Sequence, residues 1–192
     1  SLIEDQEYRP DQSVMKSSKF FPGTTIEERG GLRRVAHYDN DGTFLKHQVY
    51  RKDGTLERSG ERLRDGRYHI RYYFADGVNV ERERFFMSTL VLSFERTYRN
   101  DGEHTTASET RLISNEADKE YAKTFYNEHG VKVARITKSP IVGTKGEVFN
   151  DTGEKVIAAY ERTPWTTQEA YFREDGSIEQ SRLSYANSTT AV

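Results

Sequence analysis

The sequence predicts an all-β protein, an antiparallel meander of about 10–13 strands built from repeated hairpins in an open, twisted or curled sheet. Two observations support this fold class. A short turn motif recurs along the chain, and the segments between its copies alternate between apolar and polar residues with the period of two that is typical of strands. Because the same alternation fits a closed sheet, a lipocalin-like barrel is the alternative fold.

The turn motif consists of an aromatic residue, two variable positions, an acidic or polar residue and a glycine. Asp-Gly and Asn-Gly favour tight hairpin turns, because glycine lacks the Cβ atom that disfavours a positive φ. Successive copies, of which the third lacks the aromatic residue, end at Gly42, Gly54, Gly66, Gly77, Gly102, Gly130, Gly153 and Gly176. The early copies predict a reversal after every strand, and the later, more widely spaced copies predict one after every second strand.

Three regions follow from this pattern. Residues 1–31 lack the motif and carry Pro10 and the run Phe20–Gly23, so we expect an irregular N-terminal arm. The hairpin repeats occupy residues 32–186, and residues 187–192 are expected to form a flexible tail.

Within the repeats, the alternation predicts strands most clearly at Tyr68–Phe74, Leu90–Glu95, Val131–Ala134 and Lys155–Tyr160. Further reversals are expected where turn formers or chain breakers cluster, near Met87-Ser88, Ser114-Asn115, Pro140–Gly146 and Thr163-Pro164. The segment Asn115–Tyr126 also has the spacing of a short helix, which stays open as an alternative. The charged segment Thr55–Leu63 is suited to an edge of the sheet.

The composition excludes several classes of function. The chain has 29 Lys and Arg residues against 31 Asp and Glu, a net charge of −2, so it lacks the positive charge of a general nucleic-acid binder. Without cysteine it has no disulfide, thiolate catalysis or zinc–thiolate site. No segment is apolar over the ~20 residues that span a bilayer. The compartment stays open: the protein is cytoplasmic, or exported after loss of an N-terminal signal.

The aromatic-x-x-Asp/Asn-Gly turn at hairpin spacing resembles MORN-type repeats, especially the antitoxin-like variant of bacterial repeat proteins. The resemblance extends from Leu32 to Tyr185 and rests on copies such as Tyr50–Gly54, Tyr73–Gly77 and Phe172–Gly176. It implies an extended or curled antiparallel meander that serves as an interaction scaffold, in some members at lipid surfaces.

No motif predicts an enzyme, a cofactor or a metal site. The Gly-x-Ser-x-Gly elbow of hydrolases and the phosphate-binding glycine loop are absent, and the histidines lack the spacing of metal ligands. His37 and His47 flank the turn at Gly42 and could oppose each other across a hairpin as a polar pair. Glu81 and Glu83 share a strand face, which we interpret as a solvated charge ladder; a hydrolase that uses them is a weaker alternative.

We therefore predict a non-enzymatic β-repeat binding or scaffold module with a protein partner and without nucleic acid. The Arg-rich segment 51–84 supplies the candidate surface, because arginine and aromatic side chains interleave on its strands as they do in protein-binding hot spots. The predicted binding residues are Arg67, His69, Arg71, Tyr73, Arg82 and Arg84. A lipocalin-like carrier of a small apolar ligand is the alternative function.

Overall fold

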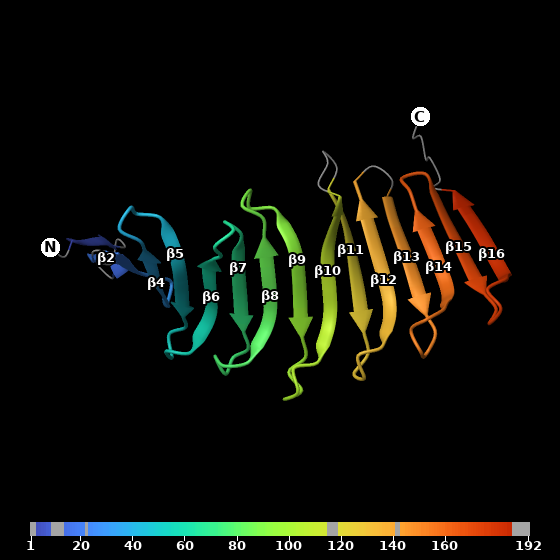
Figure 1. The fold of residues 1–192 in the computed structure, drawn as a ribbon, viewed down its shortest axis with the longest axis horizontal. Helices are drawn as coiled ribbons and strands as arrows, with labels where there is room; N and C mark the ends of the chain where they lie inside the picture. The colour runs from blue at the N-terminus through green and yellow to red at the C-terminus, as the bar shows by residue number, and fades with distance from the viewer. Residues whose placement is uncertain (1–2, 9–13, 22, 115–118, 141–142, 186–192) are drawn as a thin grey trace. The chain divides into compact units, whose positions relative to one another are not determined.

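The computed structural model describes residues 3–8, 14–21, 23–114, 119–140 and 143–185, and these contain strands and turns but no helix. The strands are β1 (Ile3–Tyr8), β2 (Val14–Phe21), β3 (Thr24–Arg29), β4 (Leu32–Tyr38), β5 (Phe44–Tyr50), β6 (Leu56–Arg62), β7 (Tyr68–Tyr73), β8 (Val80–Phe86), β9 (Leu92–Tyr98), β10 (Thr106–Ser114), β11 (Glu120–Tyr126), β12 (Lys132–Ser139), β13 (Gly143–Phe149), β14 (Val156–Arg162), β15 (Thr166–Phe172) and β16 (Ile178–Tyr185). Strand order in the sheet follows the chain from β1 to β16 (Figure 1).

The predicted antiparallel meander is confirmed. No pairing joins β16 to β1 among the described residues, so the sheet is open and the alternative closed barrel is not formed. There are more strands than predicted, because residues 1–31 contain β1, β2 and β3 instead of an irregular arm. The reversal between β3 and β4 is made by Gly30 and Gly31, both at positive φ. This turn lacks the aromatic and acidic residues of the motif, which is why the sequence pattern did not reveal it.

Most of the remaining predicted elements are found. The alternating segments overlap β7, β9, β12 and β14, although β9 begins at Leu92, so Leu90 and Val91 lie in the preceding turn instead of the predicted strand. Reversals occur at Met87–Val91 and at Thr163–Thr166. Glu120–Tyr126 is strand β11, so this part of the helical alternative is wrong. The segment Thr55–Leu63 contains β6, which pairs with β5 on one side and β7 on the other and is not an edge. Residues 115–118, 141–142 and the expected tail 187–192 lie outside the described part.

The chain forms two compact units, one of residues 1–93 with 100–104 and the other of residues 94–99 with 105–192. The sheet within each unit is a single layer. The apolar side chains that are buried in the described residues are few and small or isolated: Ala36, Val49, Ala122 and Phe149. Stability therefore comes from main-chain hydrogen bonds and cross-strand side-chain pairs more than from a deep core.

The recurring turn is a type I turn closed by a glycine in the left-handed region. In the copy between β5 and β6, the Gly54 N–H donates to the Arg51 carbonyl (2.9 Å), and the Arg51 N–H donates to the Thr55 carbonyl (2.8 Å). Gly54 has a φ of 86°. The Asp53 carboxylate accepts the Thr55 N–H at 2.9 Å, which gives the acidic residue before the glycine its role.

In the first unit, the turn between β5 and β6 also contacts the turn between β7 and β8. The Arg51 guanidinium donates to the carbonyls of Tyr73 (2.9 Å) and Phe74 (3.2 Å). Gly77, in the second turn, approaches the first so closely that an added Cβ atom would lie 2.7 Å from the Leu56 nitrogen. The motif therefore specifies contacts between turns as well as the local reversal.

The second unit repeats this arrangement. Arg99 follows an aromatic residue as Arg51 does, and its guanidinium donates to the Tyr126 carbonyl at the start of the next turn on that side. Further along the chain, Lys155 Nζ donates to the Glu174 carbonyl at 2.9 Å. A basic side chain in one turn thus caps the backbone of the turn that follows two strands later.

Candidate functional site

The predicted binding residues do not share one surface. Arg67 lies in the turn before β7, where its guanidinium pairs with the Asp65 carboxylate at 2.7 Å. His69, Arg71 and Tyr73 do lie on the same side of β7, since their contacts run to a common set of neighbours on β6 and β8.

Arg82 and Arg84 of β8 lie on the opposite side of the sheet. Their guanidinium carbons stand 4.3 and 5.6 Å from the centroid of the Tyr72 ring, a residue that alternates with His69 and Arg71 along β7. The prediction therefore combined residues of two surfaces, each with its own chemistry.

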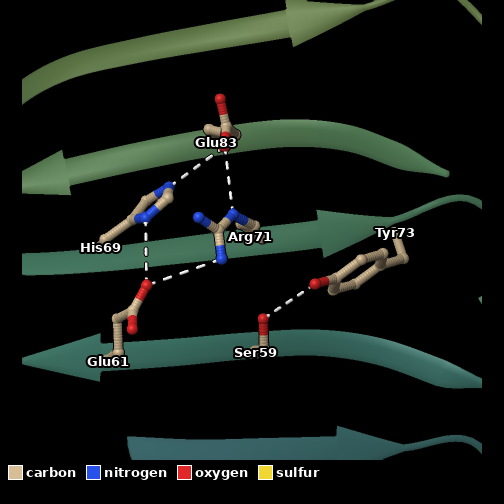
Figure 2. A network of polar contacts seen from close by, with 6 residues as sticks. All are labelled: Ser59, Glu61, His69, Arg71, Tyr73 and Glu83. Atoms are coloured by element: carbon tan, nitrogen blue, oxygen red, sulfur yellow. Dashed lines mark hydrogen bonds and ion pairs between the residues drawn. The ribbon is translucent and has the colours of Figure 1, made fainter. Parts of the chain in front are cut away.

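The first surface, here called the glutamate–histidine face, consists of Ser59, Glu61, His69, Arg71, Tyr73 and Glu83 (Figure 2). Glu83 Oε1 lies 3.2 Å from His69 Nε2 and 3.2 Å from Arg71 Nε. Glu61 Oε1 lies 3.6 Å from His69 Nδ1 and 3.6 Å from Arg71 Nη1. These four contacts form a closed ring in which two glutamates bridge one histidine and one arginine.

His69 is covered on all sides by this ring and by Phe85, whose ring stacks on the imidazole at a centroid distance of 4.0 Å. Its side chain is 5% exposed. Burial lowers the pKa of His69, as does Arg71, while Glu83 and Glu61 act in the opposite direction. The imidazole is therefore neutral near pH 7. Glu61 and Glu83 both pair with Arg71, and the buried His69 Nε2 has no hydrogen-bond partner of good geometry within the described residues. This face has little left to offer a ligand.

The second surface, here called the arginine–tyrosine face, is made of three cross-strand rows on β6, β7 and β8. The strand registers define the rows as Arg58–Tyr72–Arg82, Gly60–Ile70–Arg84 and Arg62–Tyr68–Phe86. Opposite residues of antiparallel strands project to the same side, so the rows form one surface. It carries four arginines and no carboxylate.

Two arginines of this face, Arg82 and Arg84, lie against the ring of Tyr72. The Nε atoms of Arg58 and Arg82 are buried and donate no hydrogen bond within the described residues. The Arg82 guanidinium lies over the Tyr72 ring, an arrangement worth about 0.5–2 kcal/mol depending on how dry the pair is. No ion pair is found for Arg58 or Arg82 within the described residues, so their positive charges are not neutralised by a carboxylate there.

A hollow of about 300 Å³ adjoins the arginine–tyrosine face. The exposed surface of its lining is mostly apolar, and the lining residues are Arg34, Phe44, His47, Gly60, Glu61, Tyr68, Ile70, Phe86 and Leu90. The His47 ring covers Gly60 across the strand pair, because a Cβ atom at position 60 would lie 2.4 Å from His47 Cε1. The same device recurs in the second unit, where the Tyr160 ring covers Gly146.

Burial, together with the positive charges of Arg34 and Arg58, lowers the pKa of His47 to about 4. His47 is therefore neutral near pH 7, and its Nδ1 atom is buried without a hydrogen-bond partner in the described residues. The hollow thus presents an uncharged ring beside the arginines.

This shift predicts a pH dependence of stability. Because the unfolded chain binds a proton on His47 near pH 6.5 and the folded chain only near pH 4, stability falls as pH falls through this window. The loss attributable to His47 is about 1 kcal/mol after allowance for its partial exposure. His47→Phe keeps a ring over Gly60 but cannot titrate. Thermal unfolding at several pH values is expected to show a weaker decline in this variant; an unchanged decline would assign the effect to other groups.

The structure places His37 and His47 on opposite sides of the sheet, since His47 pairs with Ala36 and His37 with Lys46. They do not form the polar pair considered from the sequence. Within the part of the chain that the structure describes, no group of three or more His, Asp or Glu side chains is arranged to hold a metal ion. Nor do the described residues include any helix that could cross a membrane.

No protein-family model matches the chain, and no curated protein sequence matches it significantly. The MORN-type resemblance therefore stays a prediction that rests on the turn motif.

Sequence reasoning missed Arg58, Tyr72 and the hollow. The sequence does contain the information that places Arg58 opposite Tyr72, in the turn at Gly66. Counting outward from its closing pair, Leu63 and Arg67, places Arg58 opposite Tyr72. The pairing of Tyr72 with Arg82 could not be counted in the same way, because a bulge between Tyr72 and Tyr73 shifts the register with β8.

Proposed function

We propose that the chain is a non-enzymatic binding module whose arginine–tyrosine face receives an acidic segment of a protein partner. The observation that carries this proposal is the row Arg58–Tyr72–Arg82, in which two arginines flank a tyrosine and neither pairs with a carboxylate of the described chain. Arginine and tyrosine dominate protein-binding hot spots, because they bury a large area and direct several donors at the partner. Carboxylates of a partner would neutralise the charge of these two guanidinium groups.

Charge complementarity favours an acidic partner over a neutral one. Apart from Arg84, the three rows place three arginines, Arg58, Arg62 and Arg82, on one surface, while the net charge of the whole chain is −2. An acidic segment is attracted to these arginines, so electrostatics would direct it to the face.

The opposite side of the sheet supports binding over catalysis. His69 is the histidine nearest to two carboxylates, yet its ring is 5% exposed and both nitrogens face glutamates. A general acid or base must reach the proton that it transfers, and the covered imidazole cannot. The scaffold role implied by the MORN-type resemblance agrees with this proposal.

The test uses a fluorescently labelled poly-glutamate peptide and anisotropy titrations at low and high salt. The double variant Arg58→Gln/Arg82→Gln is expected to bind about tenfold or more weakly than the parent. The matched control, Arg33→Gln/Arg67→Gln, removes the same charge from arginines that pair with Glu28 and Asp65 outside the face, and is expected to keep most of the affinity.

Three outcomes would overturn the proposal. The parent protein could fail to bind the peptide, the control could lose as much affinity as the double variant, or a single-stranded oligonucleotide could bind more tightly than the peptide. Circular dichroism and thermal unfolding of each variant verify that the affinities refer to folded protein.

A further inference from the structure

We infer that the hollow beside the arginine–tyrosine face holds one large apolar side chain of the same acidic segment. The recognised sequence would then contain an acidic residue and a large apolar residue two positions apart in an extended conformation. This inference rests on the proposed function and deepens it, because it states what the partner must carry in addition to negative charge.

The spacing of the rows supports a two-residue separation. Arg58, Tyr72 and Arg82 form one row, and Gly60, which forms part of the hollow, lies in the next. Successive rows on one side of a sheet are two residues apart, about 7 Å. An extended peptide has the same repeat, so a carboxylate placed at Arg58 and Arg82 sets the side chain two residues on above Gly60.

The hollow is built to receive an apolar group. Phe44, Tyr68, Ile70 and Phe86 line it, and Gly60 contributes no side chain. Phe44 stands 5.6 Å from the His47 ring and 6.3 Å from the Tyr68 ring, centroid to centroid. At neutral pH the uncharged His47 can be covered by an apolar side chain without the desolvation of a charge. The volume of about 300 Å³ suits a single large side chain more than an extended lipid or cofactor.

Leu90 is the strongest sign that this hollow has a function. It occupies the position of the left-handed glycine in the turn between β8 and β9, where its N–H donates to the Met87 carbonyl at 2.9 Å. Its φ is 61°, a conformation that is unfavourable for a residue with a Cβ atom. The side chain is 67% exposed and lines the hollow, so burial within the described chain does not compensate for the strained backbone. Contact of the Leu90 side chain with a ligand would compensate for this strain.

The experiment compares three labelled peptides on the full chain. One alternates Thr and Glu with a single Phe in place of a Glu, the second replaces this Phe by Ala, and the third replaces every Glu by Gln. The Phe-to-Ala change is expected to weaken binding about tenfold, as loss of one buried aromatic side chain does. The Glu-to-Gln change is expected to remove most of the affinity.

Leu90→Gly provides the decisive variant. We expect it to unfold at the same or a higher temperature than the parent, because glycine tolerates the left-handed backbone. We also expect it to bind the Phe peptide about fivefold more weakly while its affinity for the Ala peptide is unchanged. The control Val78→Ala shortens a side chain that is 76% exposed in a different turn, and should alter neither affinity.

Failure of the inference is distinguishable from failure of the proposed function. Equal affinity for the Phe and Ala peptides, with the dependence on Glu retained, would overturn the inference about the hollow and leave the acidic partner standing. Binding that does not depend on Glu, or no saturable binding at all, would overturn both. Displacement of the Phe peptide by myristate at lower concentration than by unlabelled peptide would also overturn the inference, because it assigns the hollow to a small amphiphile.

Discussion

Gly77→Ala is expected to lower the free energy of unfolding by about 3 kcal/mol or more. Gly77 has a φ of 70°, which any residue with a Cβ atom adopts at a cost of about 1–2 kcal/mol. The new Cβ atom would in addition lie 2.7 Å from the Leu56 nitrogen and 2.9 Å from Thr55 Cβ. One obstacle is backbone that is already fixed in the preceding turn, so the two turns must separate.

The matched control is Gly54→Ala. Gly54 occupies the same motif position with a φ of 86°, yet a Cβ atom there would meet nothing within 4 Å. Its expected loss is about 1–2 kcal/mol, the backbone cost alone. Denaturant unfolding of both variants measures the difference, which reports the packing of one turn on the next. Equal losses would show that these turns do not pack rigidly and that the glycine serves the local turn only.

This comparison separates what the motif predicts from what it conceals. The aromatic-x-x-Asp-Gly pattern predicts a reversal, and the reversals at Gly42, Gly54 and Gly77 follow from local turn chemistry. The contact between neighbouring turns does not follow from local turn chemistry. It depends on the distance between two hairpins, and the pattern describes each turn separately. The pattern also has no means of finding a turn without its residues, such as Gly30-Gly31 between β3 and β4.

Leu90 is a second feature that the turn motif could not predict, because this turn lacks the glycine of the motif. The sequence predicts a reversal near Met87-Ser88 and a strand that includes Leu90. The reversal is found with the hydrogen bonds of the glycine turns, but Leu90 lies in the turn and not in a strand. Nothing in the local sequence indicates a left-handed leucine. Local propensity opposes this conformation, so it is imposed by the strands on either side.

The candidate site could be predicted only in part, for a reason that concerns strand pairing. Alternation along β7 correctly placed His69, Arg71 and Tyr73 on one side. Whether those side chains are available depends on β6 and β8, which supply Glu61 and Glu83 and neutralise them. A single strand carries its own alternation but not the charges of its neighbours.

Glu83→Ala is the second change with a large expected effect, about 2–3 kcal/mol of the free energy of unfolding near neutral pH. The Glu83 side chain is 18% exposed and its Oε1 atom serves both His69 and Arg71, each at 3.2 Å. Its removal leaves the buried imidazole without its nearest carboxylate and takes the acceptor from Arg71 Nε. Glu61→Ala is the matched control. Glu61 is 46% exposed and 3.6 Å from the same two residues, so its loss is expected to cost about 0.5–1 kcal/mol.

The pH dependence identifies which contact is responsible. The folded chain holds the pKa of His69 below its ordinary value, so this group contributes stability above pH 6.5 that declines as pH falls. Glu83 opposes the shift, and Glu83→Ala should therefore steepen the decline in acid. Denaturant unfolding of Glu83→Ala in a His69→Phe background tests this directly, because phenylalanine can stack on Phe85 and needs no carboxylate. If Glu83→Ala lowers the free energy of unfolding by as much in that background, Glu83 stabilises the fold through Arg71 alone. If the loss is smaller there, Glu83 stabilises the fold through the buried His69.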